Sequence, residues 1–213
     1  MKGSKWLITG MVAVLLLTFG GIVQAQEMGK PQMASVMGVE GHPLGCTCDE
    51  CVMHAIGKAG FTTVDVVPQP YISVKYTMPM DGDPESIGKM MGDVMGKLMG
   101  LVQAGKVEMT GPPFSIYYGE VEGGWDVLTG IPVKTETMVG GEFSSGSLPA
   151  GKALKATHYG PYEGLATSYA AWKKYMEDNK ITTTGAMWEV YVDDPEKVAD
   201  PSQLRTELYQ ILN

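Results

Sequence analysis

The sequence predicts an α+β domain built from two β-α-β-β units. These units form one mostly antiparallel sheet with two helices on one face, which leaves the other face available as a concave cleft. The first observation is that two segments carry the 3.6-residue apolar spacing of amphipathic helices. The second is that each helix is preceded by one short β-branched and aromatic run and followed by two. The repeated order indicates an internal duplication, with units over about 66–135 and 150–213.

The first unit begins with a strand over 71–78, in which alternation places Ile72, Val74 and Tyr76 on one face. A helix over 87–104 follows, and strands over 114–119 and 127–135 complete the unit. The apolar positions of the helix repeat every three or four residues: Ile87, Met90, Met91, Val94, Leu98, Leu101 and Val102. Its glycines recur every four residues, at Gly88, Gly92, Gly96 and Gly100. Since each costs roughly 0.8–1 kcal/mol relative to alanine, we interpret them as a smooth surface for close packing.

The second unit repeats this pattern. A strand over 154–159 ends at the turn Gly160-Pro161, and a helix runs to about Asn179. The apolar stripe of that helix is Leu165, Tyr169, Trp172 and Met176. Strands over 188–192 and 206–212 close the unit. Packing both helices on the same face of the sheet buries their apolar stripes together.

The N-terminal residues predict export. Lys2 and Lys5 precede an apolar stretch from Trp6 to about Val23, and Val23-Gln24-Ala25 supplies small residues at −3 and −1 of a cleavage site. We therefore expect a signal peptide over 1–25 and a secreted or periplasmic product without a membrane segment; an uncleaved membrane anchor is the alternative. A Gly-, Met- and Cys-bearing extension over 26–60 then leads to one domain over 61–213.

The charge of the mature chain disfavours one class of partner. Loss of Lys2 and Lys5 from 16 basic residues leaves 14 against 24 acidic residues. Nucleic-acid binding favours a basic face, so we expect no nucleic-acid partner. The excess of acid is compatible with a cationic ligand.

The extension contains a cluster of possible soft-metal ligands: Cys46, Cys48, Cys51 and His54. Three thiols and an imidazole suit Zn²⁺ or Cu⁺, although the spacing matches no standard zinc pattern. In an oxidising compartment a disulfide, either Cys48–Cys51 or Cys46–Cys51, is the main expectation. The odd number of cysteines then predicts a free thiol or a disulfide-linked dimer, and metal binding is the alternative.

One carboxylate stands out in the last third of the chain. Trp188-Glu189-Val190-Tyr191-Val192 reads as a strand, with Glu189 and Tyr191 on one face. A poorly solvated carboxylate is costly unless something pairs with it. Glu189 is therefore either a solvent-facing residue or the base of an aromatic-lined ligand cleft.

Four segments together resemble the GyrI-like domains, which are also known as the effector-binding domains of AraC-type regulators. In order they are Leu148-Pro149-Ala150-Gly151, His158-Tyr159-Gly160-Pro161-Tyr162-Glu163, Trp188-Glu189-Val190-Tyr191 and Leu204-Arg205-Thr206-Glu207-Leu208-Tyr209. The likeness covers about Val66 to Leu212. The resemblance implies a duplicated fold whose pseudo-symmetric cleft binds small aromatic or cationic molecules. The signal peptide and the lack of a helix-turn-helix candidate argue against transferring a regulatory role.

The resemblance also implies site residues. Glu189 matches the central acidic residue of the family and Tyr191 its strand tyrosine, while Tyr117, Tyr118 and Trp125 fall in regions that line the cleft. We expect a small-molecule-binding protein that needs no cofactor. Some relatives are hydrolases with a matching Glu, so the alternative is a hydrolase in which Glu189 activates water.

Overall fold

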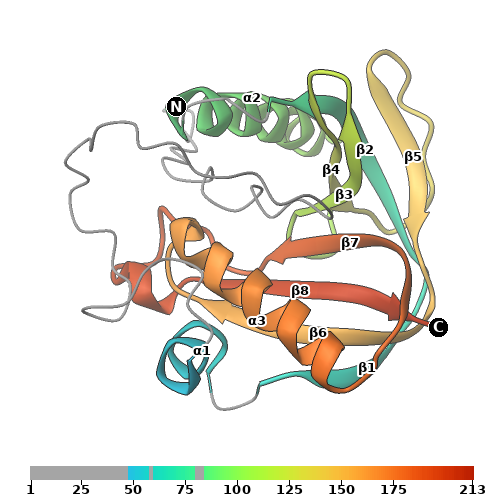
Figure 1. Cartoon of the computed structure of the whole chain (residues 1–213). Coiled ribbons are helices and arrows are strands. Elements are labelled where there is room, and N and C mark those ends of the chain that lie inside the picture. The colour runs from blue at the N-terminus through green and yellow to red at the C-terminus, as the bar shows by residue number, and fades with distance from the viewer. Residues whose placement is uncertain (1–47, 58–59, 80–83) are drawn as a thin grey trace.

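The computed structural model describes residues 48–57, 60–79 and 84–213. It contains an eight-stranded, mostly antiparallel sheet that curls into a half-barrel, with helices packed against it (Figure 1). The helices are α1 (Asp49–Ile56), α2 (Pro84–Gln103) and α3 (Leu165–Asp178). The strands are β1 (Thr62–Val66), β2 (Gln69–Met78), β3 (Phe114–Val121), β4 (Gly124–Pro132), β5 (Phe143–Leu148), β6 (Gly151–Tyr159), β7 (Thr183–Tyr191) and β8 (Arg205–Leu212). The predicted α+β class is confirmed.

The strand order explains how the two units join. Along the sheet the order is β1-β6-β8-β7-β3-β4-β2-β5, and the paired strands are antiparallel. The units β2-α2-β3-β4 and β6-α3-β7-β8 meet at the central β3–β7 pair. Each unit also has a leading strand that pairs with the other unit: β1 with β6, and β5 with β2. The units are therefore interlocked at both ends of the sheet.

Helices α2 and α3 lie on the same side of the sheet, α2 near the first unit and α3 near the second (Figure 1). The apolar stripe of α2 is buried as its spacing predicts, with Met91, Met95 and Leu98 at most 1% exposed. One cluster joins both helices to the sheet through Met91 and Met95 of α2 and Leu165 and Trp172 of α3. The main core therefore lies between the helices and the sheet.

The opposite face of the sheet forms a second core. Phe114, Ile116, Leu128 and Trp188 are at most 6% exposed there, although they pack with residues of the strands rather than with α2 or α3. The curl of the sheet brings these side chains together with apolar residues from β1 and β5. We expected the helix-free face to provide an open cleft, but apolar side chains fill its centre.

Helix α1 lies beside α3 (Figure 1), inside the segment that the sequence predicts to be an extension. Its Cys51, Ala55 and Ile56 are at most 5% exposed and pack in the region where α1 contacts α3 and β6. Just after it, Phe61 stacks on Tyr175 of α3 with ring centroids 4.3 Å apart. One side of α3 is therefore packed against residues that precede β1.

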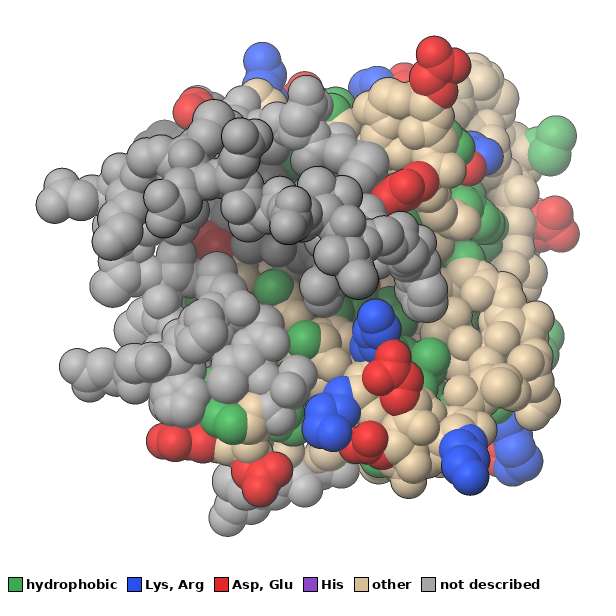
Figure 2. Space-filling model, in the orientation of Figure 1, with side chains coloured by type: hydrophobic (Ala, Val, Ile, Leu, Met, Phe, Trp, Pro, Cys, Tyr) green, Lys and Arg blue, Asp and Glu red, His purple; other side chains and the backbone are tan. Residues whose placement is uncertain are grey.

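On the exposed surface of α3, acidic side chains lie next to basic ones. Figure 2 shows acidic and basic side chains next to one another over the region of α3. Lys174 and Asp178 form one such pair on this helix, at 2.8 Å. Among the described elements, no helix has the length and apolar character needed to cross a bilayer.

Candidate functional site

The predicted carboxylate is buried in the main core. Glu189 of β7 is 2% exposed, so the solvent-facing alternative is excluded. Trp188 and Val190 pack into the second core, and alternation along the strand directs Glu189 and Tyr191 to the helix-bearing face. The alternation within β7 matches the sequence prediction. The site, however, lies under the helices and not on the face without them.

Three phenols donate hydrogen bonds to this carboxylate. Tyr117 of β3 and Tyr191 of β7 bond Oε2 of Glu189 at 3.0 and 2.9 Å. Tyr169 of α3 bonds Oε1. Both carboxylate oxygens are therefore held in place by donors from three different elements, which fixes the orientation of the group.

Burial and hydrogen bonding act in opposite directions on the ionisation of Glu189. Desolvation raises the pKa of its carboxyl, and the hydrogen bonds from Tyr169, Tyr191 and Tyr117 lower it again. Desolvation also raises the pKa values of the three tyrosines well above their ordinary range, with a further contribution from the negative charge of Glu189. The phenols remain protonated donors, as an ionised carboxylate requires.

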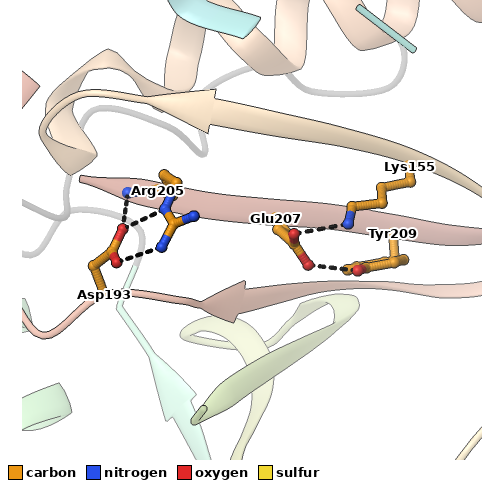
Figure 3. A network of polar contacts seen from close by, with 5 residues as sticks. All are labelled: Lys155, Asp193, Arg205, Glu207 and Tyr209. Atoms are coloured by element: carbon orange, nitrogen blue, oxygen red, sulfur yellow. Dashed lines mark hydrogen bonds and ion pairs between the residues drawn. The ribbon is translucent and has the colours of Figure 1, made fainter. Parts of the chain in front are cut away.

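Two partly buried acids of the domain have cationic partners. On β8, Glu207 pairs with Lys155 at 2.7 Å, and Arg205 holds Asp193 through two bonds of 2.8 Å (Figure 3). Glu189 is the more deeply buried acid, yet none of the ion pairs among the described residues includes it. The site therefore has a fixed acceptor for positive charge and, within the described residues, no side chain that neutralises it.

The hydrogen-bond network continues into the first unit. The Ser115 side chain bonds Tyr191 and lies 2.8 Å from Oγ1 of Thr129, which lies 3.0 Å from the Tyr76 hydroxyl. The Tyr76 hydroxyl also contacts Sδ of Met91 on α2. Ser115 and Thr129 are fully buried, and Tyr76 is partly exposed. One chain of hydroxyl groups thus links Glu189 to the opposite side of the site.

The predicted aromatic residues occupy different places. Tyr117 and Tyr191 contact Glu189, and Trp125 of β4 packs at the edge of the same core cluster. The indole nitrogen of Trp125 is buried and has no hydrogen-bond partner among the residues that the structure describes. Tyr118 is 50% exposed and lies beside Lys75, with its ring centroid 5.4 Å from the lysine Nζ, so the structure does not bring it to Glu189.

Sequence reasoning did not identify Tyr169, Tyr76, Ser115 or Thr129 as parts of the site. Tyr169 was assigned only to the apolar stripe of its helix. A usable signal was present: a tyrosine in a buried stripe needs a partner for its hydroxyl group. Ser115 and Thr129 are ordinary polar residues in strands, and their contact depends on the β3–β4 register, in which they are direct partners.

The cysteine cluster is only partly described. Cys48 is exposed before α1, and Cys51 is buried within it. Cys46 and the His54 side chain lie outside the described residues, as does the expected signal peptide over 1–25. Within the part of the chain that is described, no group of three His, Cys, Asp or Glu residues is arranged to hold a metal ion.

The fold is that of an α+β domain with a buried acidic residue under its helices. Residues 61–210 match the model of the GyrI-like small molecule binding domain family, and the chain belongs to this family. A search of curated protein sequences found no significant match.

Solved structures of EcmrR share the fold. The C-terminal domain of EcmrR is 21% identical, with a TM-score of 0.62 over 72% of this chain and 96% of that one. EcmrR in its DNA complex is 22% identical with the same TM-score, and the match covers 57% of that longer chain. A hydrolase from Listeria innocua is 16% identical, with a TM-score of 0.45 over 72% of this chain and 91% of that one.

Proposed function

We propose that the domain binds a small organic cation with an aromatic surface, and that Glu189 is its counter-ion. The observation that carries the proposal is the buried carboxylate, held by three tyrosines, without a cationic side chain among the described residues. A bound cation would supply the opposite charge that a buried carboxylate requires. It would also favour the ionised form of Glu189 against the effect of burial.

The surrounding rings suit an aromatic cation better than a metal ion. Tyr117, Tyr169 and Tyr191 supply phenol rings beside the carboxylate, and Tyr162 packs edge-on against Tyr191 with centroids 5.8 Å apart. Cation–π attraction adds about 0.5–2 kcal/mol per favourable contact. A hard metal ion would instead need several oxygen ligands, and both oxygens of Glu189 already accept hydrogen bonds.

The expected signal peptide supports an exported function. Its basic residues, apolar stretch and small residues before Gln26 support export. We therefore propose a secreted or periplasmic ligand-binding protein.

A matched pair of ligands tests the role of charge. 1-Methylquinolinium and 1-methylnaphthalene share a two-ring skeleton and differ in the positive charge. We expect calorimetry to show binding of the cation and much weaker binding of the neutral compound. Glu189→Gln keeps the shape of the side chain and should weaken cation binding by about 1–3 kcal/mol, as for hydrogen bonds to charged groups generally.

Glu207→Gln is the matched control, because Glu207 pairs with Lys155 on the other face of the sheet. It should leave cation affinity unchanged. Equal binding of both ligands, or equal affinity of wild type and Glu189→Gln, would contradict the counter-ion role. Hydrolysis remains the alternative chemistry of the same carboxylate: turnover of an ester panel that is lost in Glu189→Gln would favour it.

A further inference from the structure

A buried histidine connects the sheet to helix α3. His158 of β6 is 1% exposed, and its two ring nitrogens contact different parts of the chain. Nδ1 lies 2.8 Å from the hydroxyl oxygen of Ser168, near the start of α3. Nε2 lies 3.1 Å from the carbonyl oxygen of Pro161, in the turn between β6 and α3. One side chain therefore holds a strand, the turn that follows it and the next helix together.

The contacts of His158 show which ring nitrogen carries a proton. A carbonyl oxygen can only accept, so Nε2 donates its N–H to Pro161. In the neutral ring Nδ1 is then an acceptor, and the hydroxyl group of Ser168 donates to it. Gly164 lies close to the ring, because a Cβ atom at this position would be 3.0 Å from Cε1 of His158. Both contacts are directional, so they fix how the start of α3 lies on the sheet.

A serine hydroxyl bonded to a histidine is also the arrangement that activates a nucleophile. Ser168 and His158 are both buried in the protein, so a substrate does not reach either of them. Their contacts join β6, the turn and α3 instead. A positioning role is therefore a better explanation of the pair than a catalytic one.

The first unit has a different contact at the equivalent place. The antiparallel β3–β7 register makes Tyr117 and Tyr191 equivalent positions of the two units. Tyr76 lies two strands away from Tyr117 along the paired registers, and His158 lies two strands away from Tyr191. The hydroxyl group of Tyr76 contacts the sulfur atom of Met91 on α2. His158 instead has two nitrogens that bond the turn and α3, so the second unit holds its helix by more specific contacts.

The residue after Ser168 belongs to the acidic site. Tyr169 donates a hydrogen bond to Oε1 of Glu189. Because neighbouring residues of a helix keep a fixed geometry, holding Ser168 on β6 also sets the direction of the Tyr169 side chain. We propose that His158 is a positioning residue of the acidic site, which holds Ser168 so that the Tyr169 hydroxyl group stays on Glu189. Its effect on ligand binding rests on the proposed function, whereas its effect on Glu189 does not.

Ser168→Ala tests this role by removing the contact with His158. The hydrogen bond from Tyr169 lowers the pKa of Glu189, so a displaced Tyr169 should leave that pKa higher, as in Tyr169→Phe. Carbon-13 NMR titration of the Glu189 carboxyl group measures the shift. In a Tyr169→Phe background, Ser168→Ala should cause no further rise, because the donor through which it acts is already absent.

Ser73→Ala is the matched control. Ser73 is also fully buried, and its hydroxyl group donates to the carbonyl oxygen of Ser144 at 3.2 Å. Its removal should leave the pKa of Glu189 unchanged. Gly164→Ala is a second test variant, which keeps Ser168 and His158 and places a methyl group against the ring. It should also raise the pKa of Glu189, and it decides the question if Ser168→Ala does not fold.

An unchanged pKa of Glu189 in Ser168→Ala, or in Gly164→Ala if only that variant folds, would overturn the positioning role. An equal rise with and without Tyr169→Phe would also overturn it, because the effect would then not pass through Tyr169.

Calorimetry with 1-methylquinolinium separates this role from the proposed function. Ser168→Ala should weaken binding of the cation, and Ser73→Ala should not. If the wild type does not bind the cation, the proposed function is contradicted. The NMR titration needs no ligand, so it still decides the role of His158.

Discussion

The hydroxyl groups of Tyr117 and Tyr191 donate to the same oxygen of Glu189 and lie 3.4 Å apart, although the two residues are 74 positions apart in the chain. In the antiparallel β3–β7 register, Phe114 pairs with Val190 and Ile116 pairs with Trp188. These pairs are equivalent under a local two-fold axis that relates Tyr117 to Tyr191, so one tyrosine of each unit contributes to the same contact. The duplication therefore supplies two equivalent tyrosine donors, one from each unit, whereas the carboxylate that accepts both hydrogen bonds comes from the second unit alone.

The burial of Glu189 predicts a pH-dependent stability difference between the wild type and Glu189→Gln. The folded-state pKa of Glu189 is raised above the ordinary value of 4.5. The folded state thus binds more protons than the unfolded state between these two values, and the wild type loses stability relative to Glu189→Gln as pH rises through that window. Urea unfolding from pH 4 to pH 8 measures this difference, and a constant difference would contradict the assignment.

The hydrogen bond from Tyr169 predicts a change in the ionisation of its partner. This donor lowers the pKa of Glu189 against the effect of burial, so Tyr169→Phe should raise that pKa further. Carbon-13 NMR titration of the Glu189 carboxyl group measures the shift. Tyr175→Phe is the control on the same helix, since Tyr175 stacks on Phe61 away from Glu189. The same shift in both variants would argue for a general effect of loosening α3.

Two glycines of α2 are expected to weaken the helix without a packing role. Among the described residues, and apart from the backbone of α2 itself, a Cβ atom at Gly96 or Gly100 would meet no atom within 4 Å, so close packing within this part of the chain does not explain these positions. Gly96→Ala and Gly100→Ala should each stabilise the protein by about 0.8–1 kcal/mol, measured by thermal unfolding. Gly130→Ala should destabilise it, because its Cβ would lie 2.8 Å from the Phe114 ring and 2.9 Å from the Ile72 carbonyl oxygen.

The packing of α1 predicts that this helix contributes to stability. Ile56 is 2% exposed, and Ile56→Ala should cost about 2–5 kcal/mol of unfolding free energy if α1 belongs to the folded body. Val67→Ala removes an apolar side chain that is 75% exposed and should have little effect. Chemical unfolding of the two variants gives the comparison. Similar small effects would mean that the chain before Phe61 is dispensable for folding.

The β-α-β-β order inside each unit could be predicted because the apolar spacing of α2 and α3 and the composition of their flanking strands are strong local signals. The leading strand β1 (Thr62–Val66) was not predicted. β5 was not predicted, since Phe143-Ser144-Ser145-Gly146-Ser147-Leu148 lacks the β-branched residues of a typical strand. This segment is a strand because it pairs with β2. The amino-acid composition of a segment does not reveal that a distant strand will pair with it.

The site could be predicted only as far as alternation allows. The pattern of β7 separates Glu189 and Tyr191 from Trp188 and Val190, and the structure has the same separation. Alternation does not say which face the helices cover, because both faces of this sheet are apolar. Similarly, the spacing of α3 places Tyr169 in the core but does not identify Glu189 as the partner of its hydroxyl group.

The leading strands have a consequence for how the chain can be divided. Because β1 pairs with β6 and β5 pairs with β2, each unit completes the edge of the other. A fragment that contains one unit would expose a row of unpaired backbone groups where its neighbour's strand belongs. Two copies of such a fragment could satisfy each other by exchanging those strands, as in a domain-swapped dimer. The single chain thus has the connectivity expected when the two subunits of a strand-swapped symmetric dimer are joined end to end.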